Sequence, residues 1–249
     1  MTTVAIVQAR MSSTRLPGKV LRPLLGEPML THVMRRTSRA QRLDATVVAT
    51  STAPEDDAIA ELAARQGWLC SRGSLEDLLD RYITAARAHH ADVVVRITAD
   101  CPLIDPSIID ATIAAFAAGG CDYAATGLEP RTLPRGLDVE VMAIAALEKA
   151  WREDADPAWR EHATPYLYRH PERFALCRVG SDEDHSGHRW TVDTPEDFEL
   201  IRRIYEALGR DDFSWRDVLA LVSANPSWED VNRQVVQKTV PPGATPGAR

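Results

Sequence analysis

The sequence has few cysteines and no long apolar run, and both shortages exclude whole classes of protein. Its four cysteines include no CxxC pair, so we expect neither a zinc site nor a disulfide framework. No apolar stretch approaches the roughly 20 residues that a membrane-spanning helix needs. The N-terminus runs straight into strand-like sequence without the basic start or cleavage site of a signal peptide. We therefore expect a cytoplasmic protein with no membrane partner.

Positive charge is also in short supply. The chain has 29 Lys and Arg against 36 Asp and Glu, a formal net charge of -7. Such a surface argues against a nucleic-acid partner, because Lys and Arg contacts to phosphate dominate that affinity. With 249 residues, 45% of them hydrophobic, the chain can bury a sizeable core. We expect one domain over residues 1–238 and a disordered tail over residues 239–249, which is rich in Pro, Gly and Ala.

Short apolar runs alternate with helical periodicity through the first half of the chain. The expected strands are Thr2–Ala9, Ala45–Ser51 and Asp92–Ile97, and the expected helices are Pro28–Ala40, Glu55–Gln66, Ser74–His90 and Pro106–Ala118. This alternation predicts βαβ units in a mainly parallel sheet with helices on both faces. Ligands of such sheets bind outside the carboxyl ends of the strands. The residues that follow Ala9, Ser51 and Ile97 are therefore the first candidates for a site.

The pattern changes between residues 127 and 174. A short strand is expected at Leu137–Met142, a helix at Ala143–Trp151, and a helical segment at Trp159–His170 that Pro165 should bend or split. We interpret residues 127–174 as an insertion over the sheet edge that serves as a lid or as the contact of a homodimer. Strands at Phe174–Val179 and His188–Thr194, and helices at Pro195–Leu208 and Ser214–Val222, complete the expected elements.

The segment after the first strand is rich in groups that bind anions. Three cations and three hydroxyl side chains occupy ten positions, namely Arg10, Ser12, Ser13, Thr14, Arg15 and Lys19. Backbone N–H groups in such a turn can form an anion-binding nest, to which Arg and Lys add charge. A Walker A loop is the nearest known pattern, but it needs Gly at Ser13 and Ser or Thr at Val20. The alternative interpretation is a solvated surface loop.

An ordered series of motifs then identifies a resemblance. The motifs are AR-x-x-S-x-RLPGK at residues 9–19, Arg72-Gly73-Ser74, Asp100-x-Pro102-Leu103, Arg135-Gly-Leu-Asp-Val-Glu140, Glu161-His162 and Trp190-Thr-Val-Asp193-Thr-Pro-Glu-Asp197. Together they resemble the cytidylyltransferases that activate sugar acids, the CMP-sialate and CMP-Kdo synthetase group. The variant Val7-Gln8-Ala9-Arg10 is similar to the spore-coat polysaccharide biosynthesis branch. The resemblance covers residues 2–208.

The resemblance implies a single Rossmann-like nucleotidyltransferase domain that uses CTP and Mg²⁺. It would transfer CMP to a small acidic acceptor, such as a sugar acid, and release pyrophosphate. The implied nucleotide-binding residues are Ala9, Arg10, Met11, Ser12, Ser13, Arg15, Lys19, Arg72, Gly73, Ser74 and Asp100. The implied catalytic residues are Arg10, Lys19, Asp100 and Asp193, and the implied acceptor-binding residues are Arg135, Glu140, His162 and Tyr166.

Two aspartates are the expected metal ligands, and each has a purely structural alternative. Asp100 ends a strand, where one or two carboxylates commonly hold Mg²⁺, but it could instead cap the turn before Pro102. Asp193 precedes Thr194-Pro195, where an ordinary helix N-cap is the usual interpretation. The resemblance makes Asp193 the second metal ligand and leaves the cap to Thr194. Ser74 is likewise expected to be a helix N-cap.

Two other functions compete with a cytidylyltransferase. A nucleotide-sugar-dependent glycosyltransferase usually presents an Asp-x-Asp motif after the corresponding strand, where this chain has Asp100-Cys101-Pro102. A catalytically inactive nucleotide-binding protein would be expected to have lost Lys19 or one of the two aspartates, and all are present. No Cys or Ser nucleophile with a base partner is evident, so we expect direct displacement without a covalent enzyme intermediate.

Overall fold

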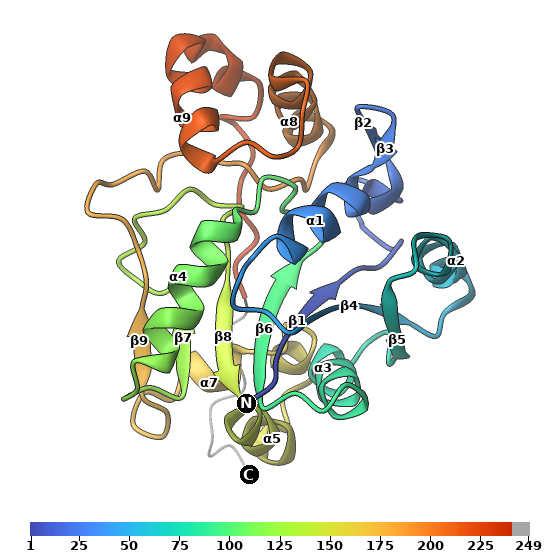
Figure 1. The fold of residues 1–249 in the computed structure, drawn as a ribbon, viewed down its shortest axis with the longest axis vertical. Coiled ribbons are helices and arrows are strands. Elements are labelled where there is room, and N and C mark those ends of the chain that lie inside the picture. The colour runs from blue at the N-terminus through green and yellow to red at the C-terminus, as the bar shows by residue number, and fades with distance from the viewer. Residues whose placement is uncertain (241–249) are drawn as a thin grey trace.

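A seven-stranded sheet forms the centre of the protein (Figure 1), as the computed structural model of residues 1–240 shows. In spatial order the strands are β5 (Leu69–Gly73), β4 (Ala45–Ser51), β1 (Thr3–Gln8), β6 (Val93–Thr98), β8 (Glu140–Ala143), β7 (Tyr123–Ala125) and β9 (Leu176–Arg178). The first four are parallel, β8 is antiparallel to both neighbours, and β7 is parallel to β9. The expected mainly parallel mixed sheet is confirmed.

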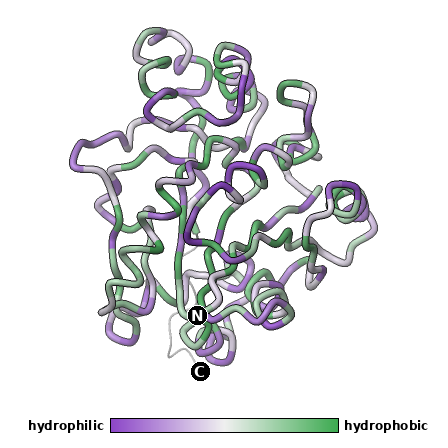
Figure 2. Tube along the Cα trace, in the orientation of Figure 1, coloured by the Kyte–Doolittle hydropathy of each residue, from purple (hydrophilic) through white to green (hydrophobic). Residues whose placement is uncertain are grey.

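Helices cover both faces of this sheet, which is why its central strands are almost wholly apolar. One face packs against α1 (Met29–Ser38), α2 (Asp57–Gln66) and α4 (Pro106–Ala117), and the other against α3 (Leu78–Ala88), α5 (Ile144–Glu153) and α7 (Pro165–Tyr168). Alternate residues of β1 enter the two cores, Val4 and Ile6 on one side, Ala5 and Val7 on the other. Figure 2 shows the hydrophobic colour along these strands.

A third apolar cluster lies beyond the carboxyl ends of the parallel strands, at the top of Figure 1. It joins α8 (Pro195–Leu208) and α9 (Trp215–Ala224) to the hairpin of β2 (Pro23–Leu24) and β3 (Glu27–Pro28). The short elements are η1 (Lys19–Leu21), η2 (Pro54–Asp56), α6 (Pro157–Arg160) and η3 (Pro226–Val231). Among residues 1–240, no helix is both long and apolar enough to cross a membrane.

Residues 188–194 do not form the expected strand. Only Arg189 makes a single bridge, to Arg135. The reason is that this extended segment pairs with two different loops: the Trp190 N–H donates to the Arg135 carbonyl (2.7 Å), and the Val192 N–H donates to the Asp100 carbonyl (2.8 Å). A change of partner after two residues prevents a continuous ladder.

The helix expected from Ser74 begins later, at Leu78. The Ser74 hydroxyl accepts from the Asp77 N–H (3.0 Å), which makes a turn, and Asp77 is the true N-cap because its carboxylate accepts from the Asp80 N–H (2.8 Å). Strands β5 and β7 are absent from the expected elements, because β5 is half-exposed at the sheet edge and β7 is only three residues long.

The interpretation of residues 127–174 as an insertion over the sheet edge needs correction. Their strand β8 lies inside the sheet, between β6 and β7. Pro165 does split the helical segment, since α6 ends at Arg160 and α7 begins at Pro165. A lid or dimer role for α6 and α7 stays a prediction. Of the expected disordered tail, residues 241–249 lie outside the described residues.

Arg36 of α1 holds the third cluster against the sheet, and its loss should be costly. The fully buried guanidinium donates to the carbonyls of Ile104 (2.7 Å), Asp211 (2.6 Å) and Phe213 (3.0 Å). We expect Arg36→Ala to lower the free energy of unfolding by about 3 kcal/mol or more, because buried carbonyls lose their donors. Denaturant titration would measure it, with Arg35→Ala, whose half-exposed side chain pairs with Glu27 and Asp211, expected to cost below about 1 kcal/mol. Equal losses would contradict this role.

Candidate active site

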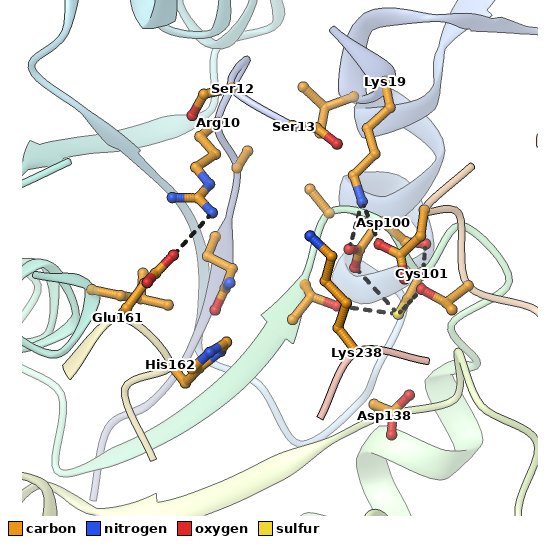
Figure 3. Close-up of a pocket in the computed structure, with 18 of the residues that line it drawn as sticks. Arg10, Ser12, Ser13, Lys19, Asp100, Cys101, Asp138, Glu161, His162 and Lys238 are labelled. Carbon is orange, nitrogen blue, oxygen red and sulfur yellow. Dashed lines mark hydrogen bonds and ion pairs between the residues drawn. The ribbon is translucent and has the colours of Figure 1, made fainter. Parts of the chain in front are cut away.

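A cavity of about 400 Å³ opens where β1 and β6 end (Figure 3). The pairing of Gln8 with Thr98 aligns these two strand ends, as expected for a ligand site of a parallel sheet. The cavity collects most of the side chains that the sequence singled out. Those that line it are Ala9, Arg10, Ser12, Ser13, Arg15, Lys19, Asp100, Arg135, Glu140, His162 and Asp193.

The cavity is positively charged in a negatively charged protein. Its cations are Arg10, Arg15, Lys19, Arg81, Arg96, Arg135 and Lys238, and its carboxylates are Asp100, Asp138, Glu140, Glu161 and Asp193. The seven cations exceed the five carboxylates by two, although the whole chain carries a net charge of -7. A local excess of this sign favours an anionic ligand.

The loop of residues 9–19 is folded so that its last residue faces the strand ends. The Gly18 N–H donates to the Met11 carbonyl (3.0 Å), and the Met11 N–H donates to the Asp56 carboxylate (2.6 Å). Gly18 adopts a left-handed conformation, φ +68°, which favours glycine. This turn starts η1 at Lys19 and brings that side chain into the cavity.

The Lys19 ammonium joins the two predicted metal ligands. Its Nζ lies 2.9 Å from Asp100 Oδ2, 3.0 Å from Asp193 Oδ1 and 2.7 Å from the Val192 carbonyl oxygen. The two aspartates come from distant parts of the chain, one after β6 and one before α8. Three oxygens therefore surround one cation at the centre of the site.

This ion cluster shifts the pKa values of Lys19 and Asp100 toward their charged forms. Burial would raise the pKa of Asp100, but the charge of Lys19 and the hydrogen bonds from Thr98 and Lys19 lower it well below its usual value. Burial would lower the pKa of Lys19, but Asp100 and Asp193 together raise it. The ammonium and the Asp100 carboxylate thus stay charged around neutral pH.

Asp193 is free to face the cavity because Thr194 caps α8. The Thr194 hydroxyl accepts from the Asp197 N–H (3.3 Å), and Asp197 accepts from the Thr194 N–H (3.1 Å), which completes a capping box. The Asp193 carboxylate instead forms ion pairs through Oδ2 with Arg15 (3.0 Å) and Arg189 (3.1 Å). The expected cap at Thr194 is confirmed, so the N-cap alternative for Asp193 fails.

The loop that carries Arg135 approaches the Asp193 segment closely. A side-chain carbon at Gly136, which has φ +106°, would lie 2.6 Å from the Trp190 carbonyl carbon. Only glycine permits this approach. The Arg135 guanidinium lines the cavity, and within residues 1–240 it forms no ion pair with a carboxylate. It is therefore available to an anion.

The opposite wall holds Arg10, Glu161 and His162 (Figure 3). Arg10 lies 3.7 Å from the Glu161 carboxylate in a half-exposed ion pair. Burial, with the nearby charges of Arg96 and Arg10, lowers the pKa of His162. Its ring is therefore neutral at pH 7 and can accept a hydrogen bond.

Several predicted residues lie outside the cavity. Arg72 donates to the carbonyls of Ser51 and Ala53 (2.8 and 3.1 Å). Met11, Gly73 and Ser74 are absent from its lining. Tyr166 is buried, and its hydroxyl contacts Glu153 (3.2 Å) and Arg173 instead, so it does not face an acceptor in this cavity.

Other residues of the site escaped the sequence analysis. Arg96 and Glu140 line the cavity and form an ion pair across adjacent strands. Asp197, fully buried, binds Arg189 through both oxygens (2.8 and 2.9 Å) and so orients the arginine that contacts Asp193. The signal for Asp197 is present in the sequence, because Thr-Pro-x-Asp is a capping-box pattern. Arg96 has no such signal, because in the sequence it is a single charged residue within an apolar strand.

The donors present suit a magnesium ion that the protein coordinates only in part. Within residues 1–240, no group of three or more His, Cys, Asp and Glu side chains could hold a metal ion. However, Asp100 and Asp193 already converge on one cation, the Lys19 ammonium. Mg²⁺ is usually bound by one or two carboxylates together with substrate phosphates and water. Two converging carboxylates in an anion-binding cavity fit that pattern.

Comparisons with known proteins find relatives of this chain. The chain matches the family described as Cytidylyltransferase over residues 4–215. It is 35% identical over 233 residues to the spore coat polysaccharide biosynthesis protein SpsF of Bacillus subtilis, covering 89% of this chain and 94% of SpsF. A solved cytidylyltransferase from Leptospira borgpetersenii has a TM-score of 0.89 at 32% identity, covering 96% of this chain and 100% of that one. A CMP:2-keto-3-deoxy-manno-octonic acid synthetase complexed with CTP has a TM-score of 0.66 at 18% identity, covering 83% and 99%, which shows the fold alone.

Removal of the Lys19 charge should destabilise the protein in a pH-dependent way. In Lys19→Met, Asp100 loses its counter-ion, and its pKa should rise because burial is then opposed mainly by the hydrogen bond from Thr98. We expect a loss of about 2 kcal/mol at pH 7.5, discounted for partial exposure, that narrows as the pH falls to 4.5 and Asp100 takes up a proton. Denaturant titration at both pH values would measure it.

The matched control is Lys149→Met, since Lys149 packs on the Phe174 ring at 4.8 Å and is remote from this cluster. The change in the free energy of unfolding that Lys149→Met causes should be the same at both pH values. If the Lys19→Met deficit is the same at pH 7.5 and 4.5, Asp100 is not the group that Lys19 neutralises.

Proposed function

The chain belongs to the cytidylyltransferase family, and we propose that it transfers CMP from CTP to a small acidic acceptor with release of pyrophosphate. The observation that carries this proposal is the Lys19 ammonium between Asp100 and Asp193, inside a cavity with an excess of cations. The nucleotide is supported by the match of residues 4–215 to the family described as Cytidylyltransferase. SpsF, by its name, supports a place in polysaccharide biosynthesis.

The triphosphate would lie along the loop of residues 9–19. Arg10, Arg15 and Lys19 line the cavity on this side, together with the hydroxyls of Ser12 and Ser13. Arg binds phosphate through two parallel N–H groups, and Lys binds it as a point charge. Lys19, which contacts Asp100 and Asp193, would neutralise charge that develops on the α-phosphate, so its main contribution is to the transition state.

Mg²⁺ would be held by Asp100 and Asp193. The ion would supply positive charge that offsets the charge of the triphosphate and of the leaving pyrophosphate. Cations of the protein surround both carboxylates, since Lys19 contacts each of them, and Arg15 and Arg189 also contact Asp193. These cations would turn to phosphate oxygens as the substrate binds.

The acceptor would enter between Arg135 and His162. The Arg135 guanidinium suits a carboxylate, because it forms no ion pair with a carboxylate of residues 1–240. Neutral His162 can accept the proton of an acceptor hydroxyl. The acceptor oxygen then bonds to the α-phosphorus while the bond from that phosphorus to the bridging oxygen breaks, and pyrophosphate leaves with the electron pair. Glu140 lines the same cavity and pairs with Arg96, and its contact with the acceptor stays a prediction.

A covalent enzyme intermediate is not part of this proposal. Cys101 is the cysteine that lines the cavity, and burial together with Asp100 raises the pKa of its thiol well above the usual value. A thiol that stays protonated is a poor nucleophile. The direct displacement predicted from the sequence therefore remains the simplest route.

The nucleotide preference tests the proposed function directly. We expect CTP to exceed ATP, GTP and UTP by about tenfold or more, because a site that hydrogen-bonds one base leaves polar groups unpaired with another. The assay combines each nucleotide with Mg²⁺ and a panel of sugar acids, and follows pyrophosphate together with the mass of the product. Equal use of UTP would refute the base preference. In a parallel assay with nucleotide sugars, release of a nucleoside diphosphate without pyrophosphate would instead reveal a glycosyltransferase.

The two aspartates should behave as one unit. We expect Asp100→Asn and Asp193→Asn each to reduce turnover by at least about a hundredfold, and the double variant to lose little more, because groups that serve one ion are not additive. Thr194 caps α8, so Asp193→Asn should leave the helix intact by circular dichroism.

The control is Glu196→Gln, an exposed carboxylate in the first turn of α8, three residues from Asp193. It should leave turnover unchanged. Near-normal turnover of Asp193→Asn at saturating Mg²⁺ would remove Asp193 from the metal site.

A further inference from the structure

The C-terminal segment, residues 232–240, turns back to the active site instead of leaving the fold. It follows η3, and its first residue, Asn232, is 3% exposed. The Asn232 amide donates to the Arg189 carbonyl and to the Asp197 carboxylate, both at 3.0 Å. Asp197 also binds the Arg189 side chain. The segment is thus anchored to the same network that positions Asp193.

From this anchor the C-terminal segment crosses the cavity between its two sides. Arg15, from the loop of residues 9–19, donates to the Val236 carbonyl at 3.2 Å. Arg189 donates to the Gln237 side chain at 2.5 Å. Arg169, just after α7, donates to the Val240 carbonyl at 3.0 Å. Gln237, Lys238 and Val240 all line the cavity, so the segment is one of its walls.

Lys238 directs its ammonium into the cavity. Figure 3 shows it between the Lys19–Asp100 side and the Arg10–Glu161 side. Both neighbouring cations already have a carboxylate partner. The Lys19 ammonium lies 2.9 Å from Asp100, and the Arg10 guanidinium lies 3.7 Å from Glu161. No carboxylate of residues 1–240 forms an ion pair with Lys238, whose side chain remains exposed. Its charge is therefore available to whatever anion fills the space.

The composition of the chain makes this position unusual. The sequence contains only three lysines, Lys19, Lys149 and Lys238, and two of them line this one cavity. An ammonium on a flexible stem can follow a phosphate oxygen without a fixed fork geometry. Because Arg15 holds the backbone two residues before Lys238, the ammonium is tied to the loop proposed to carry the triphosphate.

We propose that Lys238 is a ligand for the phosphate oxygens of the bound nucleotide, delivered by the C-terminal segment that closes the cavity. This inference rests on the proposed function and adds a residue that none of the sequence motifs contains. It makes residues 232–240 part of the substrate site, whereas composition alone predicts that a disordered tail begins at residue 239.

The scarcity of lysine provides a direct test. Trace acetylation with acetic anhydride, followed by peptide mass spectrometry, reports the accessibility of each lysine in the intact protein. We expect CTP with Mg²⁺ to slow acetylation of Lys238 at least fivefold, CMP to slow it much less, and neither to affect Lys149, which serves as the internal control. Equal labelling of Lys238 with and without saturating CTP would overturn the proposal.

A variant of Lys238 distinguishes a direct contact with phosphate from simple burial of the nucleotide under the C-terminal segment. Lys238→Gln retains the backbone contacts of Val236 and Val240, so a purely steric role would leave nucleotide affinity intact. We expect calorimetry to show CTP affinity reduced about five- to tenfold, CMP affinity reduced less than twofold, and partial recovery in Lys238→Arg, with Lys149→Gln unchanged. Unaltered CTP affinity in Lys238→Gln would refute the phosphate contact.

The two proposals fail in different ways. Both measurements detect binding and need no turnover. CTP that binds and protects Lys238, but yields no pyrophosphate with any acceptor, would reject the proposed reaction and retain the phosphate contact. Pyrophosphate release from CTP with Lys238 unprotected would retain the proposed reaction and reject the phosphate contact of Lys238.

Discussion

The contact of Lys19 with Asp100 and Asp193 is the interaction on which the site depends, because it ties three distant parts of the chain to one point. The lysine comes from the loop after β1, one aspartate follows β6, and the other precedes α8. Each charge is partly buried, and alone each would be costly to remove from water. Together they are satisfied, so the loop, the sheet and the C-terminal helices are held in one geometry.

This cluster is also prepared for substrate. Asp193 receives Lys19, Arg15 and Arg189, more cations than one carboxylate needs for neutrality. The excess positive charge of the cavity follows from such arrangements, and it suits a triphosphate that exchanges carboxylate partners for phosphate oxygens. Asp197 keeps Arg189 in place from the buried side. The C-terminal segment extends the same network across the opening through Asn232 and Arg15.

Local sequence patterns anticipated much of the fold for reasons that are visible in the structure. The helix at Pro195–Leu208 was placed to the residue, because Pro195 stands at its first turn and Gly209 ends it in a left-handed conformation. The β-branched runs of β1 and β6 were equally clear, since both faces of these strands are covered. The patterns failed at Ser74, where a side-chain turn delays the helix, and at residues 188–194, where an extended segment changes partners.

The α/β class, the strands whose ends carry the site, and the motif residues that line the cavity all follow from patterns in the amino-acid sequence. They do so because periodicity and capping act over a few residues, and the carboxyl ends of parallel strands meet at one edge. The contacts of Tyr166 and Arg72 with other partners, and the place of Lys238 in the cavity, are visible only in the three-dimensional structure. These outcomes depend on contacts between residues far apart in the chain, for which no local pattern carries a signal.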